Sequence, residues 1–126
     1  MEKFKIKAFD KVHGKIRDVA AVHLIEQAVL LWIDSGNVRA TVARDMNDVN
    51  FIRRTGLKDK NDTEIDEGAI YHMGDPKITY TVVWHDTGLI GKQNGSSSYA
   101  GISSWQERIE VIGNSYENPE LLTERS

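Results

Sequence analysis

Two stretches decide how this chain folds: TGLKDKNDTEIDEGAI, residues 55–70, and IEVIGNSYENPELL, residues 109–122. The first stretch is rich in residues that favour turns, and its few apolar residues precede an apolar run at Ala69 and Ile70. This pattern is typical of a structured connection that leads into a β-strand. The turn-forming residues are Gly56, Asp59, Asn61, Asp62 and Gly68.

The first stretch partly matches a calcium-binding loop, with Asp59, Asn61 and Thr63 at alternate positions. That loop requires a glycine at its sharp turn and a bidentate acid at its twelfth position. Glu64 and Ile70 stand at those two positions. The sequence therefore predicts no metal at this stretch, and it indicates no other cofactor.

The composition is that of an ordinary globular protein, with 40% hydrophobic and 28% charged residues in 126. The absence of cysteine excludes disulfides and thiolate chemistry. The longest apolar run, residues 28–33, is far shorter than the roughly 20 residues that span a bilayer. The charged N-terminal residues do not resemble a signal peptide. We expect a cytoplasmic protein with no membrane partner.

Alternating apolar and polar residues predict that most of the chain forms strands. Residues 77–85 give the clearest strand, and Ile78, Tyr80, Val82 and Trp84 share its expected core face. Further strands are expected at residues 3–9, 16–19 and 108–112. A hairpin is expected over residues 28–44, with its turn at residues 34–37. Asn118 and Pro119 favour a short helical turn after them.

Residues 18–27 fit two structures. Val19, Val22, Ile25 and Val29 follow helical spacing. Alternatively, Glu26 and Gln27 interrupt two apolar strands. We favour strands, and the helix remains the alternative.

The N-terminal segment is basic, because residues 1–17 carry six basic and two acidic residues. Their net charge of +4 leaves −7 for the rest of a chain whose total is −3. Lys3, Lys5 and Lys7 fit the exposed face of a strand, and they are also candidates for binding nucleic acid. Tyr99 and Trp105 lie in a region rich in glycine and serine, and we expect them to be exposed. These five residues form the candidate interaction surface, for base stacking or for self-association.

The sequence shows no catalytic constellation, and we expect no enzymatic activity. His72 and His85 flank the clearest strand, and they would meet if they faced each other across a hairpin. No nearby cysteine or paired acid completes a site with them. Glu64 and Asp66 would share one face of a strand, where solvation is the ordinary state of such acids.

Three segments in the same order resemble the YopX family of phage and prophage proteins: residues 1–11, 55–70 and 109–122. They span nearly the whole chain. The resemblance implies a β-rich fold with a C-terminal SH3-type barrel, and a phage or prophage origin. The family is one of unknown function, so the resemblance implies no activity.

The chain departs from the usual family pattern at four positions. Phe9 stands in place of tryptophan, and Asp62 in place of glycine, which a turn tolerates if Asp62 adopts a positive φ. Ala69 replaces an aspartate, which argues against an indispensable catalytic acid there. Ser115 replaces an apolar residue, so we expect this position to be less buried.

Together these observations predict a mainly β protein of N-terminal hairpins packed with a C-terminal SH3-like small barrel and few helical turns. The expected domains are residues 1–50 and 51–126, or one integrated domain. The expected function is non-enzymatic binding of a phage or host macromolecule in the bacterial cytoplasm. Binding of nucleic acid by a small β-barrel is the alternative, and homo-oligomerisation is a further expectation.

Overall fold

A computed structural model describes residues 6–123, and these residues are mainly β-strands, as predicted. The chain divides into two compact units, Met1–Ile52 and Arg53–Ser126. This division falls two residues after the expected boundary. Whether each unit folds as an independent domain stays a prediction.

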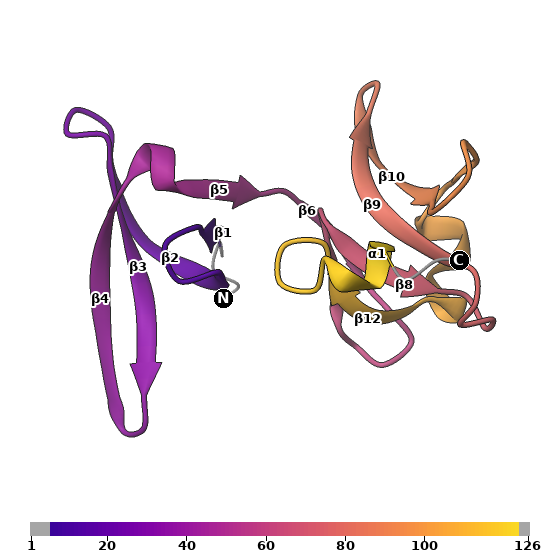
Figure 1. The fold of residues 1–126 in the computed structure, drawn as a ribbon, viewed down its shortest axis with the longest axis horizontal. Coiled ribbons are helices and arrows are strands. Elements are labelled where there is room, and N and C mark those ends of the chain that lie inside the picture. Colours follow the sequence, from indigo (N-terminus) through magenta and orange to yellow (C-terminus); the bar gives the residue numbers. More distant parts are fainter. Residues whose placement is uncertain (1–5, 124–126) are drawn as a thin grey trace. The chain divides into compact units, whose positions relative to one another are not determined.

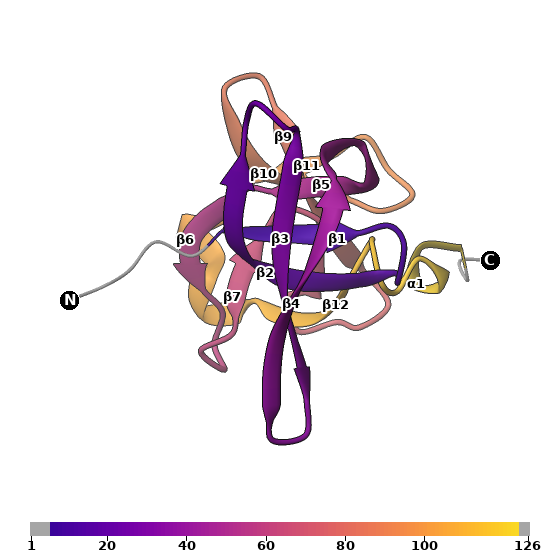
Figure 2. The same cartoon turned by 90° about the vertical axis from the view of Figure 1, so that its left-hand side faces the viewer.

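The first unit contains one antiparallel sheet of order β4-β3-β2-β1-β5 (Figure 1). Gly14, with a φ of 71°, makes the turn between β1 and β2, and Gly36, with a φ of 64°, makes the turn between β3 and β4. Positive φ is the conformation that glycine adopts most readily. Figure 2 shows β3 and β4 as the long hairpin that the sequence predicted over residues 28–44. The elements are β1 (Lys7–Asp10), β2 (Lys15–His23), β3 (Ala28–Ser35), β4 (Val38–Asp45), the 3-10 helix η1 (Met46–Asp48) and β5 (Val49–Ile52).

Residues 18–27 form strand and turn, as favoured from the sequence, and the helical alternative is wrong. β2 continues to His23, a turn occupies residues 24–27, and β3 begins at Ala28. Val22 pairs with Val29 across the ladder. Strand pairing therefore satisfies backbone groups on both sides of the turn, and Gln27 closes it with a φ of 55°.

The first unit has a small apolar core and one buried charge. Its core residues are Ala8, Val29, Leu31 and Val49. The carboxylate of Asp10 is completely buried and accepts hydrogen bonds from Arg17 Nε at 3.1 Å and Arg44 Nε at 2.9 Å. Burial raises the pKa of Asp10, but the hydrogen bonds from Arg44 and Arg17 outweigh it and lower the pKa to about 2. The Asp10 carboxylate in β1 is therefore linked by ion pairs to Arg17 in β2 and to Arg44 in β4.

The second unit contains an antiparallel sheet of order β11-β10-β9-β8-β12 and a separate ribbon of β6 and β7 (Figure 1). Its strands are β6 (Arg54–Lys58), β7 (Glu64–Asp66), β8 (Ala69–His72), β9 (Thr79–His85), β10 (Gly88–Gln93), β11 (Tyr99–Ala100) and β12 (Glu110–Asn114). The 3-10 helix η2 (Ser103–Arg108) precedes β12, and the short helix α1 (Glu120–Thr123) follows Pro119 as predicted.

The strands of residues 53–123 do not close into the SH3-type barrel that the family resemblance implied. β6 and β7 pair only with each other, and β11 at the sheet edge is two residues long. The ribbon instead packs on the sheet through side chains, because Ile65 of β7 shares a core with Tyr71, Val82 and Ile109. These strands therefore form an open sheet with a packed ribbon in place of a closed barrel.

The predicted core face of the strand at residues 77–85 is only partly buried. Val82 is buried and Tyr80 is partly buried, but Trp84 is 48% exposed and Ile78 is 42% exposed. β9 pairs with β8 only over Thr79–Thr81, while Trp84 lies beyond β8 and pairs only with Leu89 of β10. The expectation for Trp84 is wrong because this end of β9 extends past the neighbouring strand.

The stretches at residues 55–70 and 109–122 pack against each other. Asp59 is buried, and its Oδ1 accepts the N–H groups of Asn61 and Thr63, each at 2.8 Å. Its Oδ2 accepts the N–H of Val111 in β12, also at 2.8 Å. Asp62 adopts a φ of 69°, as its replacement of glycine required. The carboxylate therefore holds its own turn and attaches that turn to the second stretch.

A second contact joins the same stretches at Gly68. The Ser115 N–H donates to the Gly68 carbonyl at 2.7 Å, and the Tyr116 ring lies against Gly68. Gly68 has a φ of 90°, and a Cβ there would lie 2.5 Å from Tyr116 Cε2. Burial and the Glu67 carboxylate raise the pKa of Tyr116, and Arg53 partly opposes them. Ser115 is half-buried.

Candidate interaction surface

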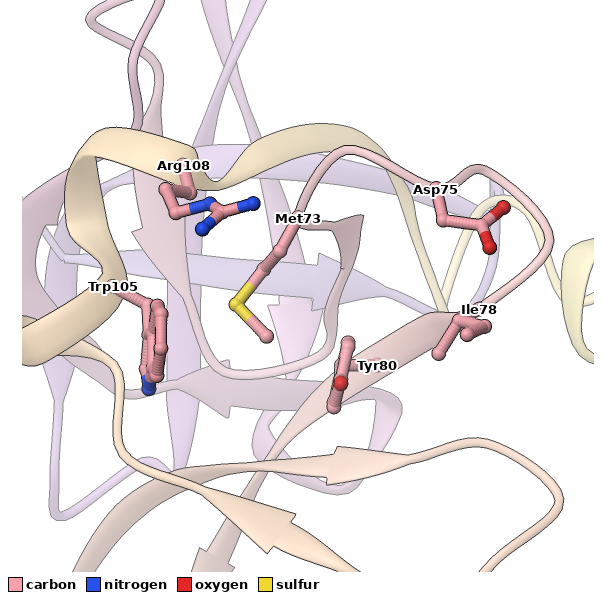
Figure 3. A pocket seen from close by; sticks show the side chains of 6 residues that line it. All are labelled: Met73, Asp75, Ile78, Tyr80, Trp105 and Arg108. Carbon is pink, nitrogen blue, oxygen red and sulfur yellow. The ribbon is translucent and has the colours of Figure 1, made fainter.

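A groove of about 220 Å³ lies on the second unit between the β8–β9 connection and η2. We call it the Trp105 groove. Figure 3 shows the Met73 side chain between the rings of Trp105 and Tyr80. The residues that line the groove are Met73, Asp75, Ile78, Tyr80, Trp105 and Arg108.

Local hydrogen bonds shape the walls of the Trp105 groove. In the β8–β9 connection, Asp75 Oδ1 accepts the Lys77 N–H at 3.0 Å, and the Asp75 carbonyl accepts the Ile78 N–H at 3.0 Å. On the opposite wall, the Trp105 N–H donates to the Ile102 carbonyl at 3.0 Å, and Ile102 is buried in the core. These hydrogen bonds therefore hold both walls in place without a ligand.

Tyr80 is held by a buried neighbour. Its ring stacks on Tyr71 with centroids 5.2 Å apart and an angle of 12° between the planes. Tyr71 is completely buried, and its hydroxyl has no hydrogen-bond partner within residues 6–123. Burial, with a smaller contribution from Tyr80, raises the pKa of Tyr71 to about 12. The stack gives the groove a rigid aromatic wall.

The Trp105 groove carries opposite charges at two ends. The Arg108 guanidinium carbon lies 5.9 Å from the centre of the Trp105 ring, and Asp75 is on the other side of Met73 (Figure 3). Both charged residues are exposed, and Trp105 itself is 43% exposed. Aromatic, methionine and arginine side chains are enriched in protein interfaces. This arrangement suits the binding of an apolar side chain that has an acidic group next to it.

The five predicted surface residues are divided between the two units, and their common surface stays a prediction. Lys3 and Lys5 lie outside the described residues, and Lys7 is half-buried in β1 of the first unit. Tyr99 and Trp105 are each 43% exposed, as expected, but Tyr99 stacks on His85 with centroids 4.3 Å apart and does not line the Trp105 groove. No sequence pattern predicted that Met73, Ile78 and Arg108 line one groove. The turn sequence at residues 74–76 was the only signal that their segment folds back.

The two histidines that flank β9 do not meet. His72 pairs with Thr79 and His85 pairs with Gly88, so they lie at opposite ends of the strand. His72 Nδ1 accepts the Gly74 N–H at 3.1 Å, and its Nε2 lies 3.7 Å from Glu110 Oε1. They do not face each other across a hairpin, because the length of β9 separates them. Within residues 6–123, no three His, Asp or Glu side chains are arranged to hold a metal ion.

A second hollow, of about 440 Å³, lies beside β6, β10 and η2. Its large aromatic residue is Trp84, and the Arg53 guanidinium carbon lies 4.6 Å from the centre of that ring. Nearby, Arg54 pairs with Glu64 at 2.9 Å. Arg53 therefore lies closer to the Trp84 ring than Arg108 lies to the Trp105 ring, at 4.6 Å against 5.9 Å.

Comparison with known families and structures is consistent with this architecture. The model of the YopX protein family matches residues 5–123. The chain belongs to the YopX family. Its fold is also similar to that in the crystal structure of protein EF1440 from Enterococcus faecalis, with a TM-score of 0.64 and 22% sequence identity. The match covers 94% of this chain and 96% of that chain. No curated protein matches the sequence significantly. Among residues 6–123, no helix has the length and apolar character needed to cross a bilayer.

Proposed function

We propose that this YopX protein is a phage- or prophage-encoded, non-enzymatic module that binds another protein in the bacterial cytoplasm. The observation that carries the proposal is the Trp105 groove, where Trp105 and Ile78 remain more than two-fifths exposed around the partly buried Met73. An apolar hollow rimmed by charge is typical of a binding surface. The turns on both walls hold it open, so binding needs little rearrangement.

The chemistry of the groove defines the partner segment. An apolar side chain would pack on Met73, whose flexible thioether adapts to irregular shapes. An acidic side chain beside it would face the Arg108 guanidinium, which makes no ion pair within residues 6–123. The expected ligand is therefore a peptide segment with an aliphatic or aromatic residue next to aspartate or glutamate.

Selection from a random peptide library on the immobilised protein tests this proposal. We expect enrichment of apolar residues adjacent to acidic ones, and loss of binding of the selected peptides in the Trp105→Ala variant. Trp84→Ala is the matched control, because Trp84 is similarly exposed but lies outside the groove. Equal binding by both variants, or selection of no peptide, contradicts the proposal. Pull-down from nuclease-treated lysate of phage-infected cells, with the same variants, then seeks the natural partner.

Nucleic-acid binding is the second candidate, favoured by the stack of His85 and the exposed Tyr99. Exposed aromatic side chains can stack on bases. It ranks second because several arginines are already engaged: Arg17 and Arg44 with Asp10, and Arg39 over the Trp32 ring at 4.2 Å. Labelled single- and double-stranded DNA should shift in a salt-dependent manner if this function holds, and Tyr99→Ala should weaken the shift. The absence of any shift at low salt rejects it.

A further inference from the structure

The turn between β2 and β3 exposes two adjacent aliphatic side chains. Leu24 is 76% exposed and Ile25 is 92% exposed, and the acidic Glu26 follows them. We call residues 24–26 the hairpin tip; it lies in the indigo-to-purple part of the chain, at the connection between β2 and β3 (Figure 1). Exposed side chains of this kind are informative when they are adjacent and not scattered.

The hairpin tip is an ordered turn. The Gln27 N–H donates to the Leu24 carbonyl at 3.3 Å, and the Gln27 carbonyl accepts the Met46 N–H at 2.8 Å. The turn therefore exposes Leu24, Ile25 and Glu26 on a backbone that these hydrogen bonds hold in one conformation. A preorganised segment loses less conformational freedom when it binds than a flexible one does.

The hairpin tip has the chemistry that the Trp105 groove selects, namely large aliphatic residues directly followed by an acid. We propose that the tip of one copy docks into the Trp105 groove of a second copy, with Ile25 or Leu24 on Met73 and Glu26 facing Arg108. This inference rests on the proposed binding function of the groove and names its partner as the chain itself. The tip and the groove are both exposed, and the negative charge of Glu26 complements the positive charge of Arg108.

The symmetry of this contact follows from its two unlike surfaces. Each copy carries one tip and one groove, so the contact is head-to-tail and produces either a ring or an open chain of copies. A contact made by a few side chains is small compared with the interfaces of stable complexes, so the association should be weak and dependent on concentration.

Sedimentation velocity with complementary variants tests the inference. The double change Leu24→Asp and Ile25→Asp removes the apolar tip, and Trp105→Asp damages the groove. All three positions are exposed, and circular dichroism verifies the fold of each variant. The wild-type protein should form assemblies as its concentration rises, whereas each variant alone should remain monomeric. An equimolar mixture should form only a 1:1 complex, because one intact tip and one intact groove remain. Val38→Asp, at another exposed aliphatic residue beside a hairpin turn, is the matched control and should assemble like the wild type.

Charge exchange tests the pairing of Glu26 with Arg108. Glu26→Arg and Arg108→Glu should each weaken assembly several-fold, and the two changes in one chain should restore most of it. A wild type that is monomeric at all concentrations, a monomeric mixture of the complementary variants, or assembly that persists in both single-surface variants overturns the inference. If peptide selection succeeds while the wild type stays monomeric, self-docking is wrong and the proposed function stands. If both fail, the groove is not a binding surface.

Discussion

The Asp59 carboxylate accepts the backbone N–H of Val111 at 2.8 Å, across a sequence separation of 52 residues. Its other oxygen accepts two N–H groups of its own turn. One buried side chain therefore links the turn-rich stretch at residues 55–70 to β12 in the C-terminal stretch. This link explains in physical terms why both stretches are needed for one fold.

Asp59→Asn should destabilise the second unit, because an amide has only one acceptor oxygen where both carboxylate oxygens now accept. We expect a loss of about 2–4 kcal/mol in the free energy of unfolding, typical of buried donors left unpaired beside a lost charge. Urea denaturation followed by tryptophan fluorescence measures it. Asp62→Asn, in the same turn but 83% exposed, is the control and should change stability by less than about 0.5 kcal/mol. Similar stability of the two variants would refute the role of Asp59.

Protonation of the Asp10 carboxylate should make the first unit less stable in acid. The folded-state pKa of Asp10, about 2, is below its ordinary value of 3.8, so the ionised form stabilises the fold. This contribution is fully present above about pH 4, and it is lost as the pH falls from there through about 2. It amounts to about 2 kcal/mol, from roughly 1.4 kcal/mol for each pKa unit. Urea denaturation at a series of pH values measures the loss.

Asp10→Asn provides the comparison for this pH dependence. The variant should be less stable at neutral pH, because Arg17 and Arg44 lose their buried counter-charge, and its stability should change less between pH 4 and 2. Asp34→Asn removes the carboxylate of an exposed pair with Arg39 and should leave the pH dependence intact. An unchanged acid profile in Asp10→Asn would contradict the assignment.

Gly68→Ala should destabilise the fold more than Gly56→Ala. Both glycines have positive φ, 90° and 80°, so both substitutions strain the backbone, by about 1–2 kcal/mol. At Gly56 the added methyl group meets no atom within 4 Å, whereas at Gly68 it meets the Tyr116 ring. We expect an additional loss of about 1–3 kcal/mol for Gly68→Ala, from overpacking. Thermal unfolding of the two variants separates strain from steric overlap, and equal losses would exclude the ring contact as a constraint.

Tyr71 and Gly91 should be energetically coupled. A Cβ at residue 91 would overlap the Tyr71 hydroxyl oxygen, so Gly91→Ala should destabilise the sheet by about 1–3 kcal/mol. Tyr71→Phe should cost little, because it removes a buried hydroxyl that has no partner within residues 6–123. In the double variant Tyr71→Phe should recover part of the loss, with a coupling of about 1 kcal/mol. Additive losses would show that the two residues do not constrain each other.

Much of the fold was predictable because local rules decide it. Alternation of polar and apolar residues indicated the strands, and Gly36 and Pro119 marked a hairpin turn and a helix start that the structure contains. Residues 18–27 were ambiguous because apolar residues there satisfy both periodicities. The pairing of β2 with β3 decided between them, and pairing depends on a partner strand outside the local window.

The candidate site was predictable only in part. Trp105 was expected to be exposed because of its glycine- and serine-rich surroundings, and it is. Its position opposite Met73 depends on how the β8–β9 connection lies beside η2, which no local pattern encodes. The exposure of Trp84 was mispredicted for a related reason, since alternation gives the face of a strand but not where the neighbouring strand ends.

By itself, the sequence determined the β-rich class, the turns at residues 34–37 and at Asp62, and membership of the YopX family, because turn chemistry, side-chain alternation and motif order are properties of short segments. Tertiary structure alone decided the open sheet in place of a barrel, the link from Asp59 to Val111, and the assembly of the Trp105 groove. These features join residues that are distant along the chain, and their energies come from backbone pairing and burial, which exist only once the strands have packed.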